Sequence, residues 1–240
     1  MTASAATRIR SAAFLDWMDD WYGRLPSCSL REEILAREPQ GVAVMVVDLL
    51  VGFCSEGALA SPRVGALGPK AASFLRDAWA AGVRHVLLAS DAHAPDSPEF
   101  RSYPPHCLRG TREAEVISEL QELPFFEWAV HLEKGSLSVG HEPALAAWQE
   151  RHPEVRTFVI IGDCTDLCVY HTAMHLRLQA NTRGRDVDVY VPADLVDTYD
   201  LPVAAAAGLG AMPHDGDLMH RLFLYHLALN GVRVVRSVMP

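Results

Sequence analysis

The chain has 240 residues, half of them hydrophobic, and a formal net charge of −9. This length suffices for one large core and does not by itself require a second domain. The acidic balance argues against a nucleic acid or an anionic membrane surface as partner, because either would repel the protein at long range. No stretch approaches the ~20 apolar residues of a membrane span, and the first residues lack the apolar segment of a secretory signal. We therefore expect a cytoplasmic protein.

The first 40 residues differ in character from the rest. Large apolar side chains recur there at helical spacing and predict an amphipathic helix; they are Phe14, Met18, Trp21 and Leu25. A second short helix is predicted from Ser29, where Ser-x-x-Glu has the form of a capping box. We expect a helical extension over residues 1–40 and a main domain over 41–240. The extension packs on the same core or, alternatively, docks on a neighbouring subunit, which would make the protein a homo-oligomer.

Short β-branched runs follow, with room for a helix between them. They cover residues 42–48, 83–90, 155–162, 186–192 and 232–237, with a weaker run at 129–134. Near-continuous apolar strands are buried on both faces, which favours a parallel sheet between two layers of helices. Helices are expected at about 68–81, 112–121, 141–151, 166–180, 200–209 and 215–230. The sequence thus predicts an α/β fold.

Chemically capable side chains stand where several of these strands end. They are Asp48, Asp91 with His93, Lys134 and Cys168. In an open parallel sheet the ligand crevice lies outside the carboxyl ends of the strands, so we expect these groups to converge. A carboxylate that closes an apolar strand must be paired or functional, and Lys134 is the natural partner of Asp48.

Cys168 stands in the first turn of a predicted helix. Unpaired backbone amides and the helix dipole stabilise a thiolate there, so we expect a lowered pKa for this thiol. A lone cysteine in such a turn is more often a small buried side chain, but its coincidence with Asp48 and Lys134 favours a nucleophile. The five cysteines are irregularly spaced, which does not fit a disulfide framework.

Three motifs resemble those of isochorismatase-like cysteine hydrolases. They are D-x-x-x-x-F at 48–53, Lys-Gly at 134–135 and G-x-x-T-D-x-C-V at 162–169, and the resemblance covers about residues 41–237. It implies a six-stranded parallel sheet in a Rossmann-like α/β/α fold and a catalytic triad of Asp48, Lys134 and Cys168. It also implies a cis peptide bond before Cys164, with the backbone amides of Cys164 and Cys168 as the oxyanion hole. Isochorismatases proper lack the cysteine, which favours amide hydrolysis here.

A further segment resembles the metal-binding segment of nicotinamidases. Asp91-x-His93 and the Pro-Pro-His-Cys sequence at 104–107 imply that Asp91, His93 and His106 bind one divalent ion. Two imidazoles and a carboxylate suit zinc best, with iron or manganese as alternatives. Many family members carry another histidine where this chain has Glu99. We count Glu99 as a fourth candidate ligand, the alternative being a solvated loop residue.

The resemblance implies a nicotinamidase, which converts nicotinamide to nicotinate and ammonia through a thioester on Cys168 and serves NAD salvage. The substrate is then a small amide, and Phe53 and Tyr103 are expected to form apolar walls of its pocket. Nicotinamidases often carry tryptophan where this chain has Tyr103, which would reshape the pocket. Two alternatives stay open: a metal-independent amidase for a carbamoyl, ureido or maleamate-type compound, and a catalytically silent binding protein on the same fold.

Overall fold

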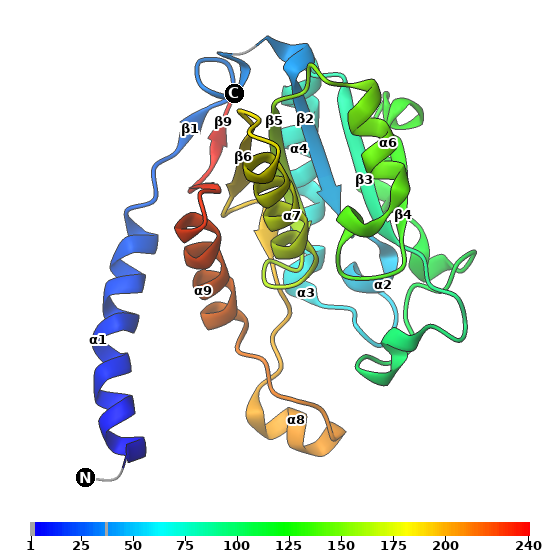
Figure 1. Ribbon diagram of the computed structural model, residues 1–240. Coiled ribbons are helices and arrows are strands. Elements are labelled where there is room, and N and C mark those ends of the chain that lie inside the picture. Colours follow the sequence, from blue (N-terminus) through cyan, green and yellow to red (C-terminus); the bar gives the residue numbers. More distant parts are fainter. Residues whose placement is uncertain (1–2, 37) are drawn as a thin grey trace.

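A parallel sheet forms the centre of the computed structural model, in which residues 3–36 and 38–240 are described (Figure 1). Its main strands are β2 (Val42–Val47), β3 (His85–Asp91), β4 (Val130–Lys134), β5 (Thr157–Asp163), β6 (Asp188–Pro192) and β8 (Arg233–Val235). They lie in the order β4-β3-β2-β5-β6-β8, and every neighbouring pair is parallel. The six expected strands are confirmed. A seventh, β7 (Val196–Asp197), pairs with the end of β5 and is too short to show a pattern in the sequence.

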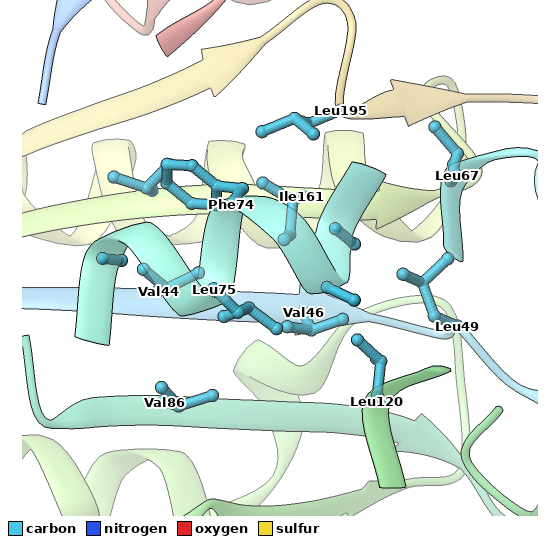
Figure 2. Close-up of a cluster of buried hydrophobic side chains, with 14 of the residues drawn as sticks. Val44, Val46, Leu49, Leu67, Phe74, Leu75, Val86, Leu120, Ile161 and Leu195 are labelled. Atoms are coloured by element: carbon cyan, nitrogen blue, oxygen red, sulfur yellow. The ribbon is translucent and has the colours of Figure 1, made fainter. Parts of the chain in front are cut away.

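Helices cover both faces of this sheet (Figure 1). α4 (Leu67–Ala80) packs on one face, and α6 (Pro143–Arg151), α7 (Cys168–Thr182) and α9 (Gly216–Leu229) pack on the other. Alternate residues of β2 divide between these layers: Val44 and Val46 lie with α4 in the cluster of Figure 2, and Met45 belongs to the opposite cluster. A strand that is apolar on both faces is therefore buried on both, as expected.

Shorter elements connect these layers. The α-helices are α2 (Val51–Cys54), α3 (Pro62–Gly65), α5 (Ser118–Gln121) and α8 (Val203–Leu209). The 3-10 helices are η1 (Ile34–Ala36), η2 (Pro39–Gly41), η3 (Pro98–Arg101), η4 (Arg112–Ala114), η5 (Phe126–Trp128) and η6 (Val139–His141). The expected helix over 112–121 is only partly present. The amide of Val51 donates to Glu115 and that of Ile117 to Leu49, so the chain is extended between η4 and α5.

The first helix lies beside the last one. α1 (Ala3–Gly23) packs on α9, where the rings of Trp17 and Trp21 make edge contacts with Tyr225.

Among the described residues, no helix is both long and apolar enough to cross a membrane.

The second helix expected at Ser29 is absent. Cys28–Ser29 forms strand β1, which pairs with β9 (Val238–Met239) near the other end of the chain. The Ser29 amide donates to Oε1 of Glu33 at 2.8 Å and the Glu32 amide donates to Oγ of Ser29 at 3.2 Å, and these bonds close a turn instead of starting an α-helix. Pairing with β9 holds this segment extended, which a local capping signal does not reveal.

Candidate active site and metal-binding group

Asp48, Lys134 and Cys168 lie together at the carboxyl edge of the sheet. Asp48 follows β2, Lys134 ends β4 and Cys168 begins α7, and all three are buried. The Lys134 ammonium is 2.7 Å from Oδ2 of Asp48 and 3.5 Å from the sulfur of Cys168. The sequence predicted this convergence. An acid, a cation and a thiol at hydrogen-bonding distance are the groups that a covalent hydrolase requires.

Asp48 has an unusual backbone conformation. Its φ is 53°, in the left-handed region that aspartate tolerates better than most residues. Two hydrogen bonds hold it there: its amide donates to Ala89 at 2.9 Å, and its Oδ1 accepts from the Asp91 amide at 2.8 Å. The conformation turns the side chain back over the end of β3, where its partners lie.

Lys134 also binds a second carboxylate, which the sequence did not predict. Its ammonium donates to Oδ1 of Asp91, the residue beside it in the β3–β4 register. Asp91 was expected only as a metal ligand. The shared lysine joins the candidate catalytic group and the candidate metal-binding group into one buried network.

Burial controls the acidity of Cys168 and Asp48. It raises the pKa of the Cys168 thiol well above its ordinary value, with the Lys134 charge opposing and the Asp48 charge adding to the rise. Burial therefore outweighs the lowering that the helix terminus was expected to cause. Burial also raises the pKa of Asp48 to about 6, against the influence of Lys134. A neutral thiol needs a base, and Asp48 is the adjacent carboxylate.

The turn before Cys168 is shaped by close packing. A side chain at Gly162, whose φ is 112°, would place its Cβ 2.0 Å from the carbonyl oxygen of Val47. The peptide bond between Asp163 and Cys164 is cis, as expected. Within the described residues, the amides of Cys164 and Cys168 donate to no backbone carbonyl outside regular elements. Both amides thus remain available to an oxyanion.

Asp91, His93 and His106 form a compact buried group. Their ligand atoms lie within 4.8 Å of one another. Nε2 of His93 and Nε2 of His106 are 3.4 and 3.5 Å from Oδ2 of Asp91. Neither ring nitrogen of His93 makes a hydrogen bond in the described structure, which is costly for a buried imidazole. These residues therefore fit a divalent metal ion.

Backbone pairing brings the two histidines together. The His93 amide donates to Cys107 at 3.0 Å, and the Arg109 amide donates to His93 at 2.9 Å. Nδ1 of His106 contacts the Pro104 carbonyl at 2.8 Å, which fixes the ring and leaves Nε2 free to bind a metal. The sequence showed the ligand types, whereas this loop pairing sets their positions.

Glu99 is not part of this group of three. It lies on η3 and is half-buried. Burial and the Asp91 charge raise the pKa of its carboxyl, and the imidazoles of His93 and His106 oppose that rise, so the carboxylate lies within electrostatic reach of the group. Ligation by Glu99, directly or through water, stays a prediction.

A pair of variants tests Glu99. Glu99→Ala is expected to weaken metal affinity about 10-fold or more, as loss of an outer partner typically does. Glu99→His should restore much of the binding, because imidazole suits the same ions. Metal affinity is measured by competition with a chelator, and Glu127→Ala removes an acidic residue of η5 as a control. Unchanged affinity in Glu99→Ala would leave Asp91, His93 and His106 as the whole site.

Aromatic rings surround the metal-binding group. Phe53 is buried with its ring 5.6 Å from that of His106, and the ring of Tyr103 is 6.3 Å away. Burial raises the pKa of Tyr103, and the negative charges of Cys168 and Glu99 add to the rise. Phe100, which the sequence did not single out, contacts both imidazoles at 5.4 and 5.6 Å. Their positions suit pocket walls.

A buried ion pair behind the nucleophile turn was also missed. Asp166 lies in the T-D-x-C motif, and its Oδ2 is 2.8 Å from Nε2 of His214. The Tyr199 carbonyl lies 2.9 Å from Nδ1 of the same ring, so both ring nitrogens face acceptors, an arrangement that favours the imidazolium form. His214 follows α8, and it pairs with Leu201 through backbone hydrogen bonds on both sides. The pair thus attaches the α8 segment to the turn that carries the nucleophile.

His214→Gln should lower the unfolding free energy by about 1–3 kcal/mol in a limited pH range. Asp166 bonding raises the pKa of His214 above 6.5 despite burial, so its stabilisation is lost as pH rises through that raised value. The pKa of Asp166 is lowered from 3.8 by His214, against burial, so its contribution is lost as pH falls below 3.8. The difference from the parent should therefore peak between these values. In an Asp166→Asn background it should disappear, and a loss of the same size there would exclude the pair as its cause.

Comparison with known proteins identifies clear relatives. The family model described as the isochorismatase domain matches residues 42–216. Nicotinamidase 1 of Arabidopsis thaliana is 30% identical over 230 residues, which cover 86% of this chain and 90% of that protein. The pyrazinamidase of Pyrococcus horikoshii, solved in complex with zinc, has a TM-score of 0.63 at 25% identity and covers 82% of this chain and 99% of its own. N-carbamoylsarcosine amidase from Thermoplasma acidophilum has a TM-score of 0.59 at 26% identity, over 81% of this chain and 95% of its own.

Proposed function

Because the chain belongs to the isochorismatase-like hydrolases and to their nicotinamidase family, we propose that it hydrolyses nicotinamide to nicotinate and ammonia. One observation carries the proposal: Lys134 joins the Asp48–Cys168 pair to the Asp91–His93–His106 group in one buried network. The Asp48–Cys168 pair would cleave the amide bond, and the Asp91–His93–His106 group would bind the ring of the substrate. The same proposal assigns the reaction to NAD salvage in the cytoplasm.

Asp48 begins the reaction by taking the proton of Cys168. A carboxylate oxygen of Asp48 and the sulfur of Cys168 lie within 4.8 Å of each other, and Lys134 stabilises the negative charge that passes from one to the other. The thiolate then attacks the carboxamide carbon, and the amides of Cys164 and Cys168 donate to the oxyanion. Asp48 returns its proton to the departing ammonia and next takes a proton from the water that cleaves the thioester.

Asp91, His93 and His106 would hold one divalent ion, zinc first, with iron or manganese as alternatives. When bound, the ion supplies a Lewis acid to which the pyridine nitrogen of the substrate can coordinate. Phe53 and Tyr103 would enclose the ring as apolar walls of its pocket. In this proposal the metal-binding group orients the ring, and the Asp48–Lys134–Cys168 group cleaves the amide.

The test is ammonia release from nicotinamide, compared with benzamide, N-carbamoylsarcosine and maleamate. We expect nicotinamide to be preferred, because benzamide lacks the ring nitrogen. After a chelator removes the metal, nicotinamide turnover should fall and return with zinc. Equal turnover of nicotinamide and benzamide, unaffected by the chelator, would contradict the proposal.

A metal-independent amidase is the second candidate, and the likeness to N-carbamoylsarcosine amidase favours it. It predicts turnover of a carbamoyl or ureido substrate that the chelator leaves unchanged. The buried, unbonded imidazole of His93 speaks for the metal-dependent candidate, because a buried polar ring without a ligand is costly. The third alternative, a silent binding protein, would show no turnover of any amide in the panel.

A further inference from the structure

A second group of two histidines and one carboxylate, the same side-chain types as in Asp91, His93 and His106, lies at the opposite edge of the sheet. His85 begins β3, His152 follows α6, and Glu154 precedes β5. Their ligand atoms are within 4.8 Å of one another. Asp91 ends β3, six residues after His85, so the two groups are roughly 20 Å apart along the strand. Nothing in the proposed reaction uses this edge.

The spacing of the three ligands suits a metal ion. Nδ1 of His152 is 3.1 Å and Nε2 of His85 is 3.7 Å from the same oxygen, Oε1 of Glu154. Bond lengths of 2.0–2.2 Å separate the ligands of a tetrahedral zinc ion by roughly 3.4 Å. The corresponding distances to Asp91 in the buried group are 3.4 and 3.5 Å. Little movement would be needed to bind an ion.

Neighbouring groups hold the two imidazoles in place. The buried Trp148 ring lies 5.5 Å from the ring of His85 and 4.7 Å from that of His152. The side chains of His85, His152 and Glu154 are 18%, 30% and 43% exposed, so an ion can enter from solvent and keep water in its open positions.

A hydrogen bond between His152 and Glu154 would by itself account for the positions of these two side chains. It does not explain why His85, which comes from another strand, presents its Nε2 to the same carboxylate oxygen. We propose that His85, His152 and Glu154 form a second site for a divalent transition-metal ion, zinc first. The bound ion would link the start of β3 to the connection between α6 and β5.

The number of bound ions tests this site without reference to catalysis. The full chain is dialysed at micromolar free zinc, and bound zinc is measured per chain for the parent and for Glu154→Gln, which keeps the side-chain shape. We expect Glu154→Gln to bind one ion fewer, and His152→Ala to do the same. His131→Ala removes an exposed histidine from β4 and should leave the count unchanged.

The parent should bind one ion more than Glu154→Gln whether or not the Asp91–His93–His106 group binds metal. Failure of this prediction would therefore be distinct from failure of the proposed function. Turnover should stay at the parent level in Glu154→Gln, because the site is remote from Cys168. Zinc should also raise the melting temperature of the parent more than that of Glu154→Gln, since only the parent gains this link. Equal zinc counts in the parent and both site variants would overturn the proposal.

Discussion

Cys168→Ala is expected to lower turnover by about 10⁴-fold or more, because a covalent nucleophile has no substitute. The sulfur lies 3.5 Å from the Lys134 ammonium, and no other thiol approaches that cation in the described structure. The cost in unfolding free energy should be small, about 1 kcal/mol. Steady-state ammonia release measures the first effect, and chemical denaturation measures the second. An acid-quenched reaction should show the acylated protein by mass spectrometry in the parent alone.

Cys164→Ala is the matched control, because it removes a thiol four residues away in the same turn. Only the backbone amide of Cys164 is assigned a role, and alanine keeps that amide. Turnover should therefore fall by much less than the ~10²-fold that loss of an oxyanion donor costs. If Cys164→Ala were as inactive as Cys168→Ala, the assignment of the nucleophile would be wrong.

Lys134→Met should abolish most turnover and lower the unfolding free energy by about 3–5 kcal/mol. The lysine is buried between the carboxylates of Asp48 and Asp91, and removing one member of a buried ion pair leaves the others uncompensated. Methionine keeps much of the side-chain length, so lost packing contributes little. Denaturant unfolding and ammonia release measure the two effects. Lys70→Met, at an exposed site on α4, should change the unfolding free energy by no more than ~0.5 kcal/mol.

A double variant separates charge from packing. Asp48→Asn with Lys134→Met removes one negative and one positive charge, so it should be more stable than Lys134→Met alone. It should stay inactive, because the base is also lost. If the single variant were as stable as the parent, or the double variant no more stable than the single, the network would not hold these residues together.

The layered fold could be predicted because its signals are local. Most strands of the sheet carry their own run of β-branched residues, and Gly82, with a φ of 105°, marks the end of α4 where one was expected. The same holds for the presumed catalytic residues. A parallel sheet brings strand ends to one edge, so Asp48, Lys134 and Cys168 were expected along the same edge once their strands were assigned.

Local signals were insufficient where distant segments pair. The capping box at Ser29 predicted a helix, yet pairing with β9 keeps the chain extended there. The helix expected over 112–121 is interrupted because residues 115–117 pair with the segment after β2.

The chemistry of the site divides in the same way. The sequence by itself determined which side chains stand at the carboxyl edge of the sheet, because it gives the residue at the end of each strand. Tertiary structure alone decided that Lys134 serves both Asp48 and Asp91, and that His214 pairs with Asp166 across 48 positions. It also decided that burial raises the pKa of Cys168, because desolvation depends on every neighbour that excludes water and not on the helix end alone.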